Sequence, residues 1–86
     1  MSRNVEITEI SEMELLNAFA SNLKYVMEYE GITQSELARK SGLSKSTICM
    51  YTKAKRMPSM AAISNICFAL NCRIDDLVPT ACVVIE

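Results

Sequence analysis

The sequence predicts an all-α protein in which five helices share one hydrophobic core. Its 86 residues suffice for a single domain, and half of them are hydrophobic while 22% are charged, as in chains that fold. Turn-forming residues are scarce, with two glycines and two prolines, and serine or threonine caps precede most of the apolar stretches. A chain this short cannot form a doubly wound sheet or a barrel enzyme with a deep cleft.

The first helix is expected from Glu12 to about Glu30. It follows a capping box, in which the hydroxyl of Ser11 and the carboxylate of Glu14 each accept a backbone N–H of the other residue. Gly31 follows at a position where a glycine commonly ends a helix. Between these signals, apolar residues recur along one helical face: Leu15, Leu16, Phe19, Leu23, Val26 and Met27.

Two short helices joined by a tight turn at Gly42 form the central feature. A second capping box, Thr33 to Glu36, opens the first of them, and Ser44 can cap the next, from Lys45 to about Lys53. Small Ala38 allows a close approach between the helices, and glycine permits the backbone of the turn. We expect a wedge of three residues between them: Leu37, Leu43 and Ile48.

The outward face of the third helix is short, polar and basic, and it contains no acid. Its residues are Lys45, Ser46, Cys49, Met50 and Lys53. Such a face fits the major groove of DNA, where the base edges present hydrogen-bond donors and acceptors.

A fourth helix follows Pro58 and is capped by Ser59. Asn71 takes the place of glycine at its end, because asparagine tolerates the left-handed conformation. Its inner stripe is Ile63, Ile66, Cys67 and Leu70. A last helical turn is expected from Ile74 to Val78, closed by Pro79.

The ends of the chain divide it into an N-terminal extension (1–10), the helical domain (11–79) and a C-terminal tail (80–86). Residues 5–9 alternate apolar and polar side chains, and residues 82–85 are rich in β-branched ones, so each could form a short β-strand. A lone strand leaves its backbone unpaired, so the two would pair within one chain or with those of a second chain. The alternative is a frayed tail at each end.

Charge is unevenly distributed although the net charge is −1. Residues 31–56 hold six basic residues and one acid, whereas residues 1–30 hold two against six and residues 57–86 hold one against three. A basic centre between acidic flanks is typical of a surface that binds a polyanion, the alternative being an ordinary solvated face.

The cysteines and the absence of histidine indicate a protein without a cofactor. None of the four cysteines forms a Cys-x-x-Cys pair, so a zinc site is not expected, and neither is an enzyme. No stretch has the pattern of a signal peptide or a membrane span, so we expect a cytoplasmic protein. There the thiols stay reduced, and burial is the simplest interpretation of all four, Cys49, Cys67, Cys72 and Cys82, although Cys49 lies on or near the outward face of the third helix.

The segment from Thr33 to Ile48, TQSELARKSGLSKSTI, resembles the helix-turn-helix of the lambda-repressor-like regulators, the Cro and XRE class. The likeness covers about residues 15–79, and it includes the link Lys-Arg-Met-Pro-Ser at 55–59. It implies a five-helix, sequence-specific double-stranded DNA-binding domain that acts as a transcriptional repressor and a homodimer.

The resemblance also implies roles for single residues. The residues at base-contacting positions are Gln34, Lys45, Ser46, Thr47 and Met50, and Gln34 matches a glutamine that also braces the recognition helix. The residues at phosphate-contacting positions are Ser44, Lys53, Lys55 and Arg56. Two departures stand out, since Ala54 replaces a glycine after the recognition helix and Met27 replaces a common arginine.

Two other functions remain open at this stage. The same fold serves as the antitoxin of toxin–antitoxin pairs, and the apolar residues of the tails could contact a toxin. It could also serve as a protein-interaction module, an alternative that the acidic flanks and the net charge of −1 favour.

Overall fold

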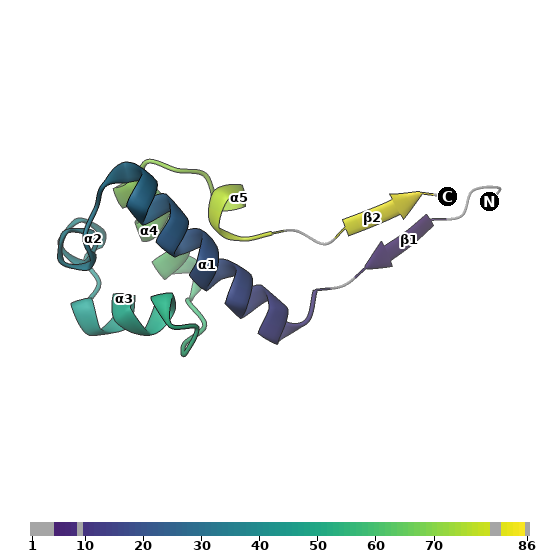
Figure 1. The fold of residues 1–86 in the computed structure, drawn as a ribbon, viewed down its shortest axis with the longest axis horizontal. Coiled ribbons are helices and arrows are strands. Elements are labelled where there is room, and N and C mark those ends of the chain that lie inside the picture. Colours follow the sequence, from purple (N-terminus) through teal and green to yellow (C-terminus); the bar gives the residue numbers. More distant parts are fainter. Residues whose placement is uncertain (1–4, 9, 80–81, 86) are drawn as a thin grey trace.

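The computed structural model describes residues 5–8, 10–79 and 82–85, the side chains of residues 10–79 among them. Five helices form one body, and a two-stranded ribbon extends from it (Figure 1). The elements in chain order are β1 (Val5–Thr8), α1 (Glu12–Glu30), α2 (Gln34–Ser41), α3 (Lys45–Thr52), α4 (Met60–Leu70), α5 (Ile74–Leu77) and β2 (Cys82–Ile85). The all-α class and the five helices are confirmed, with α3 and α5 each one residue shorter than expected.

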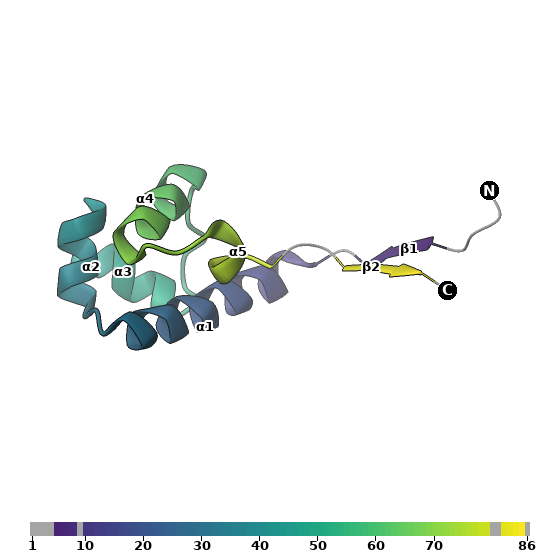
Figure 2. The same cartoon turned by 90° about the horizontal axis from the view of Figure 1, so that it is seen from above.

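The core lies where α1 crosses the other helices. α1 packs against α3, α4 and α5, and α2 packs against α3 and α4 (Figure 2). Large side chains from all five helices are fully buried there: Phe19, Leu23, Leu37, Ile48, Ile66, Leu70 and Leu77. Met27 also belongs to this core, so the position where the family often has arginine is filled by an apolar side chain.

Hydrogen-bonded caps start the four longer helices, as the sequence predicts. At α1 the backbone N–H of Glu14 donates to Ser11 Oγ over 3.2 Å, and the N–H of Ser11 donates to Glu14 Oε1 over 3.1 Å. Thr33 and Glu36 form the same box at α2, while serines cap α3 and α4. These bonds satisfy N–H groups that a helix leaves without internal partners.

Gly42 ends α2 in the left-handed conformation, with φ of 74°. A Cβ atom added there would meet no atom within 4 Å. The turn therefore requires glycine for its backbone conformation and not for space.

β1 and β2 pair antiparallel, with Val5 opposite Ile85 and Thr8 opposite Cys82. In this single chain the two terminal strands therefore pair with each other. Neither strand contacts a helix, and both views show the ribbon standing clear of the helical body (Figures 1 and 2).

The cysteines differ from their expected burial. Cys49, Cys67 and Cys72 are half-buried and carry free thiols, and the side chain of Cys82 lies outside the described residues. Cys67 and Cys72 lie against the core at the C-terminal end of α4, where both remain partly exposed. Within the described residues, no three cysteine, aspartate or glutamate side chains are grouped so as to hold a metal ion, and no helix is long and apolar enough to cross a bilayer.

Candidate nucleic-acid interface

The turn between α2 and α3 is held by its own side chains. Ser41 Oγ donates to the carbonyl of Ala38 and accepts the backbone N–H of Leu43, each over 3.4 Å. Leu37 and Ile48 are fully buried on the inner sides of the two helices, while Leu43 is half-buried beside them. The predicted wedge therefore fixes the angle between the helices, with Leu43 at its margin.

Gln34 links the start of α2 to the end of α3. Its Nε2 donates to Thr52 Oγ1 over 3.5 Å, and Thr52 Oγ1 in turn donates to the carbonyl of Cys49 over 2.8 Å. The side chain of Gln34 is half-buried, and Thr52 is buried. The bracing contact that the resemblance implies for Gln34 is thus present. Sequence reasoning missed Thr52 as its acceptor, and the only signal was a hydroxyl in the last turn of α3.

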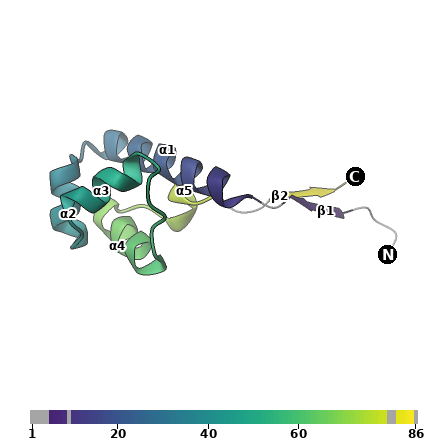
Figure 3. The same ribbon diagram turned by 90° about the horizontal axis from the view of Figure 1, so that it is seen from below.

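The outer face of α3 carries three of the predicted base-contacting residues in exposed positions. They are Lys45, Ser46 and Met50, and 37% of the surface of Met50 is accessible. Figure 3 shows α3 on the near side of the helical body, with α2 beside it. No acid lies on α3, so this face presents donors, a cation and a thioether to whatever approaches it.

Ser44 and Thr47 are joined by two hydrogen bonds at the N-terminus of α3. The Ser44 hydroxyl accepts the backbone N–H of Thr47 over 3.1 Å and donates to Thr47 Oγ1 over 2.8 Å. The donor of Ser44 is therefore used within the cap. Thr47, which is half-buried, accepts this bond and keeps its own O–H available as a donor.

The loop after α3 adopts the conformation that a glycine would favour. Ala54 has a φ of 56°, its N–H donates to the carbonyl of Tyr51, and the N–H of Lys55 donates to that of Met50 over 2.9 Å. This is the hydrogen-bond pattern of a Schellman motif. A left-handed conformation costs a residue with a side chain roughly 1–2 kcal/mol. Replacing the family's glycine by Ala54 thus keeps the geometry of the loop at the cost of strain.

The cations around α3 are exposed and have no acidic partner within the described residues. They are Lys45, Lys53, Lys55 and Arg56, and the single ion pair of the described part, Arg73 with Asp75, lies elsewhere. The nearest acid of α2, Glu36, has its pKa lowered by hydrogen bonds from Thr33 and by Lys40 and Arg39. Unpaired cations at the two ends of a short exposed helix favour contact with phosphates.

The inner side of α3 anchors it to α1. Tyr51 is 4% exposed, and its ring meets that of Phe19 edge to face, with centroids 5.8 Å apart and planes at 77°. Tyr51 therefore belongs to the core, as predicted, and holds the outer face of α3 in a fixed orientation.

Comparison with known proteins places these features in a family. The model of the Cro/C1-type HTH DNA-binding domain matches residues 22–80. A protein of Archaeoglobus fulgidus named as an uncharacterized HTH-type transcriptional regulator is 43% identical over 47 residues, which are 55% of this chain and 67% of that protein.

Two solved structures share the fold. The restriction-modification controller protein C.AhdI from Aeromonas hydrophila is 27% identical, with a TM-score of 0.70 over 72% of this chain and 94% of its own. The clp gene regulator ClgR from Corynebacterium glutamicum shares the fold at 24% identity, with a TM-score of 0.69 over 73% of this chain and 82% of its own.

Proposed function

Because this chain belongs to the Cro/C1-type helix-turn-helix family of DNA-binding transcriptional regulators, which are not enzymes, we propose that it is a sequence-specific repressor in the cytoplasm. The observation that carries this proposal is the outer face of α3. That face is exposed and free of acids, and the cations beside it have no acidic partner within residues 10–79. Inserted in a major groove, α3 would read base edges, while the cations around it contact the phosphates.

The proposed contacts divide into two groups. Lys45, Ser46, Thr47 and Met50 read bases, and Gln34 does so from the first turn of α2 while it braces α3. The residues that hold the backbone are Ser44, Lys53, Lys55 and Arg56. Since the hydroxyl proton of Ser44 is used within its cap, its phosphate contact would come from the N-terminal end of the helix.

A salt titration of DNA binding tests the proposal. Affinity should fall with salt at a log–log slope of about −0.9 for each phosphate contact. Lys53→Ala or Arg56→Ala should weaken binding to all duplexes alike and make the slope shallower by about one contact. Lys24→Ala, at an exposed position of α1 outside the basic centre, is the matched control and should leave the slope unchanged. A chain that binds no duplex at low salt would disprove the proposal.

Repression is the regulatory outcome we propose. A protein seated in two successive major grooves covers DNA that other proteins need for access. A reporter gene placed downstream of the protein's preferred site shows the direction of regulation, since repression lowers its expression and activation raises it. Lys45→Ala, expressed at the same level, should remove the effect in either case.

We further propose that the protein acts as a homodimer joined by the terminal strands. Two strands of four residues that contact no helix form a ribbon that is marginal by itself, and both of its outer edges have free backbone groups. A second ribbon at one edge would supply the missing partners. The two copies of α3 would then meet major grooves about 34 Å apart on a near-palindromic operator.

Sedimentation of a shortened chain tests this assembly. Deletion of residues 81–86 should give a monomer with weakened operator binding, while circular dichroism shows that the helices remain folded. A shortened chain that stays dimeric would mean that the helices supply the interface. A full-length chain that is monomeric at tens of micromolar would end the proposal of a dimer.

A further inference from the structure

A groove of about 390 Å³ lies between the C-terminal half of α1 and the segment that joins α4 to α5. Its lining includes Tyr25, Tyr29 and Glu30 from α1, with Cys72 and Asp76 on the other wall. In Figure 1 this junction is on the upper side of the helical body, whereas α3 is on the lower side. The groove is therefore not part of the proposed DNA-binding surface.

The α1 wall of the groove presents two aromatic rings to solvent. Tyr25 and Tyr29 are 71% and 77% exposed, and their rings stack with centroids 6.4 Å apart and planes at 18°. Such large apolar surfaces are costly in water, and neither ring belongs to the core. The faces of tyrosine rings carry partial negative charge and attract cations.

The charged residues that line the groove are both acids, Glu30 and Asp76. Burial, the neighbouring Cys67 and the carboxylates of Asp76 and Glu30 together raise the pKa of Cys72 to about 12, and no cation opposes them. No lysine or arginine lines the groove. A polyanion such as DNA or an anionic membrane surface would be repelled from this side of the molecule.

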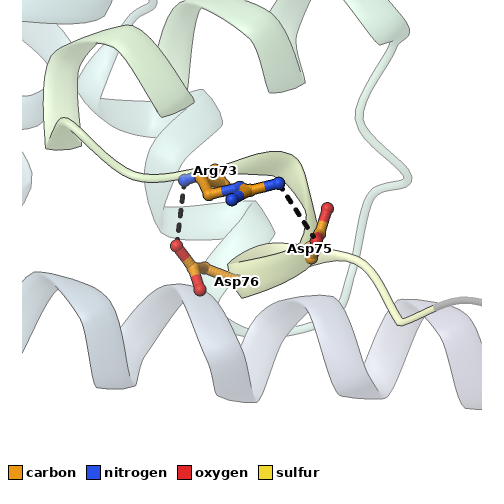
Figure 4. Close-up of polar contacts among 3 residues, drawn as sticks. All are labelled: Arg73, Asp75 and Asp76. Atoms are coloured by element: carbon orange, nitrogen blue, oxygen red, sulfur yellow. Dashed lines mark hydrogen bonds and ion pairs between the residues drawn. The ribbon is translucent and has the colours of Figure 1, made fainter.

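The cation next to Cys72 in the chain, Arg73, is paired with Asp75. Its guanidinium lies 3.9 Å from Asp75, while its backbone N–H donates to Asp76 Oδ2 over 2.9 Å. Figure 4 shows the carboxylate of Asp76 directed toward α1 and the guanidinium of Arg73 directed toward Asp75. The backbone hydrogen bond thus holds Asp76 at the groove without neutralising it.

We propose that this groove binds an arginine side chain that a partner protein presents on an exposed segment. A guanidinium is planar, so it can stack on a tyrosine ring while its N–H groups donate to Glu30 and Asp76. The aliphatic part of the arginine would rest against Val26, and the open side of the groove leaves room for the backbone of the partner.

Nuclear magnetic resonance of the full-length, ¹⁵N-labelled chain tests the proposal without DNA, so the result is independent of operator binding. The probe is the capped tripeptide acetyl-Gly-Arg-Gly-amide, and its matched control replaces arginine by neutral citrulline. The arginine peptide should shift the amide signals of residues 25–30 and 71–76. A further peptide with lysine in place of arginine should bind more weakly, and the citrulline peptide should cause no shift.

Variants separate the groove from general acidity. Tyr29→Leu and Glu30→Gln should each weaken the arginine peptide roughly two- to fivefold, the loss expected for one exposed cation–aromatic or ionic contact. Glu12→Gln, an exposed acid in the first turn of the same helix, should change nothing. Because Tyr29, Glu30 and Glu12 are all exposed, circular dichroism should show the same folded chain in every case.

Three results would overturn the proposal. The first is equal shifts with the citrulline peptide, and the second is an equal loss of affinity in Glu12→Gln. The third is a guanidinium ion that binds as tightly as the peptide, since the site would then recognise a small cation and not a segment of a protein.

Discussion

α3 and α4 are built by the same local rules and differ in what they present to solvent. Each begins at a serine cap, and each is followed within two residues by a residue other than glycine in the left-handed conformation, Ala54 at a φ of 56° and Asn71 at 52°. The outer face of α3 begins with Lys45 and leads into a cationic loop, whereas α4 has no charged residue along its whole length. Caps and inner faces therefore determine the fold, and under the proposed function the outer charges determine which helix meets DNA.

Substitutions on the inner faces of α3 and α4 should lower the stability of the fold by similar amounts, and this is the largest effect we expect. Ile48 on α3 and Ile66 on α4 are both fully buried in the same core. Truncation of either to alanine should lower the free energy of unfolding by about 2–5 kcal/mol, because a cavity remains. Chemical denaturation measures the loss. If a variant is unfolded, valine at the same position should cost about 0.5–1.5 kcal/mol. A much smaller loss at Ile66 would show that α4 contributes less to the core than its burial indicates.

Substitutions on the outer faces of α3 and α4 should have different effects on DNA binding. Lys45→Ala should cost about 1–3 kcal/mol of binding free energy on the preferred operator, and much less on random DNA, if Lys45 reads a base. Ser64→Ala, at an exposed position on α4, is the matched control and should leave binding unchanged. Fluorescence anisotropy with both duplexes measures the two losses. Equal losses on both duplexes would make Lys45 a phosphate contact.

Interactions between residues close in the sequence could be predicted from it, whereas those between distant residues could not. The capping boxes at Ser11 and Thr33 were predicted to the residue, because the bonded groups lie three residues apart. The bond from Gln34 to Thr52 spans 18 residues. Its acceptor could not be named before the angle between α2 and α3 was known.

The groove and the partial burial of the thiols could not be predicted from the sequence, because both depend on contacts between distant residues. Tyr25 and Asp76 are 51 positions apart, and only the packing of α5 on α1 brings them to one groove. Cys67 and Cys72 occupy apolar positions of the pattern, as buried residues would. They are half-buried because they lie at the margin of the core, where Cys72 also lines the open groove.

The ends of α3 and α4 give the third prediction. Ala54→Gly should stabilise the protein by about 1 kcal/mol, because glycine adopts a positive φ without the clash of a Cβ atom. In a domain of this size that gain raises the melting temperature by about 4–8 °C. Ala61→Gly, at an exposed position in the first turn of α4, is the control and should lose stability, by at most about 1 kcal/mol, since there glycine only adds freedom to the unfolded chain. A loss in Ala54→Gly would mean that Ala54 makes a compensating contact.

Asn71→Gly should have the smallest effect of the series. Asn71 ends α4 with nearly the same φ as Ala54, and its N–H donates to the carbonyl of Phe68 over 3.3 Å. Asparagine tolerates the left-handed conformation through local hydrogen bonding of its side chain, so glycine has little strain to relieve. We expect a gain of only a few tenths of a kcal/mol, within about 2 °C by calorimetry. Equal gains at both positions would show that asparagine is no better than alanine at this kind of helix end. The difference between α3 and α4 would then lie in their outer charges alone.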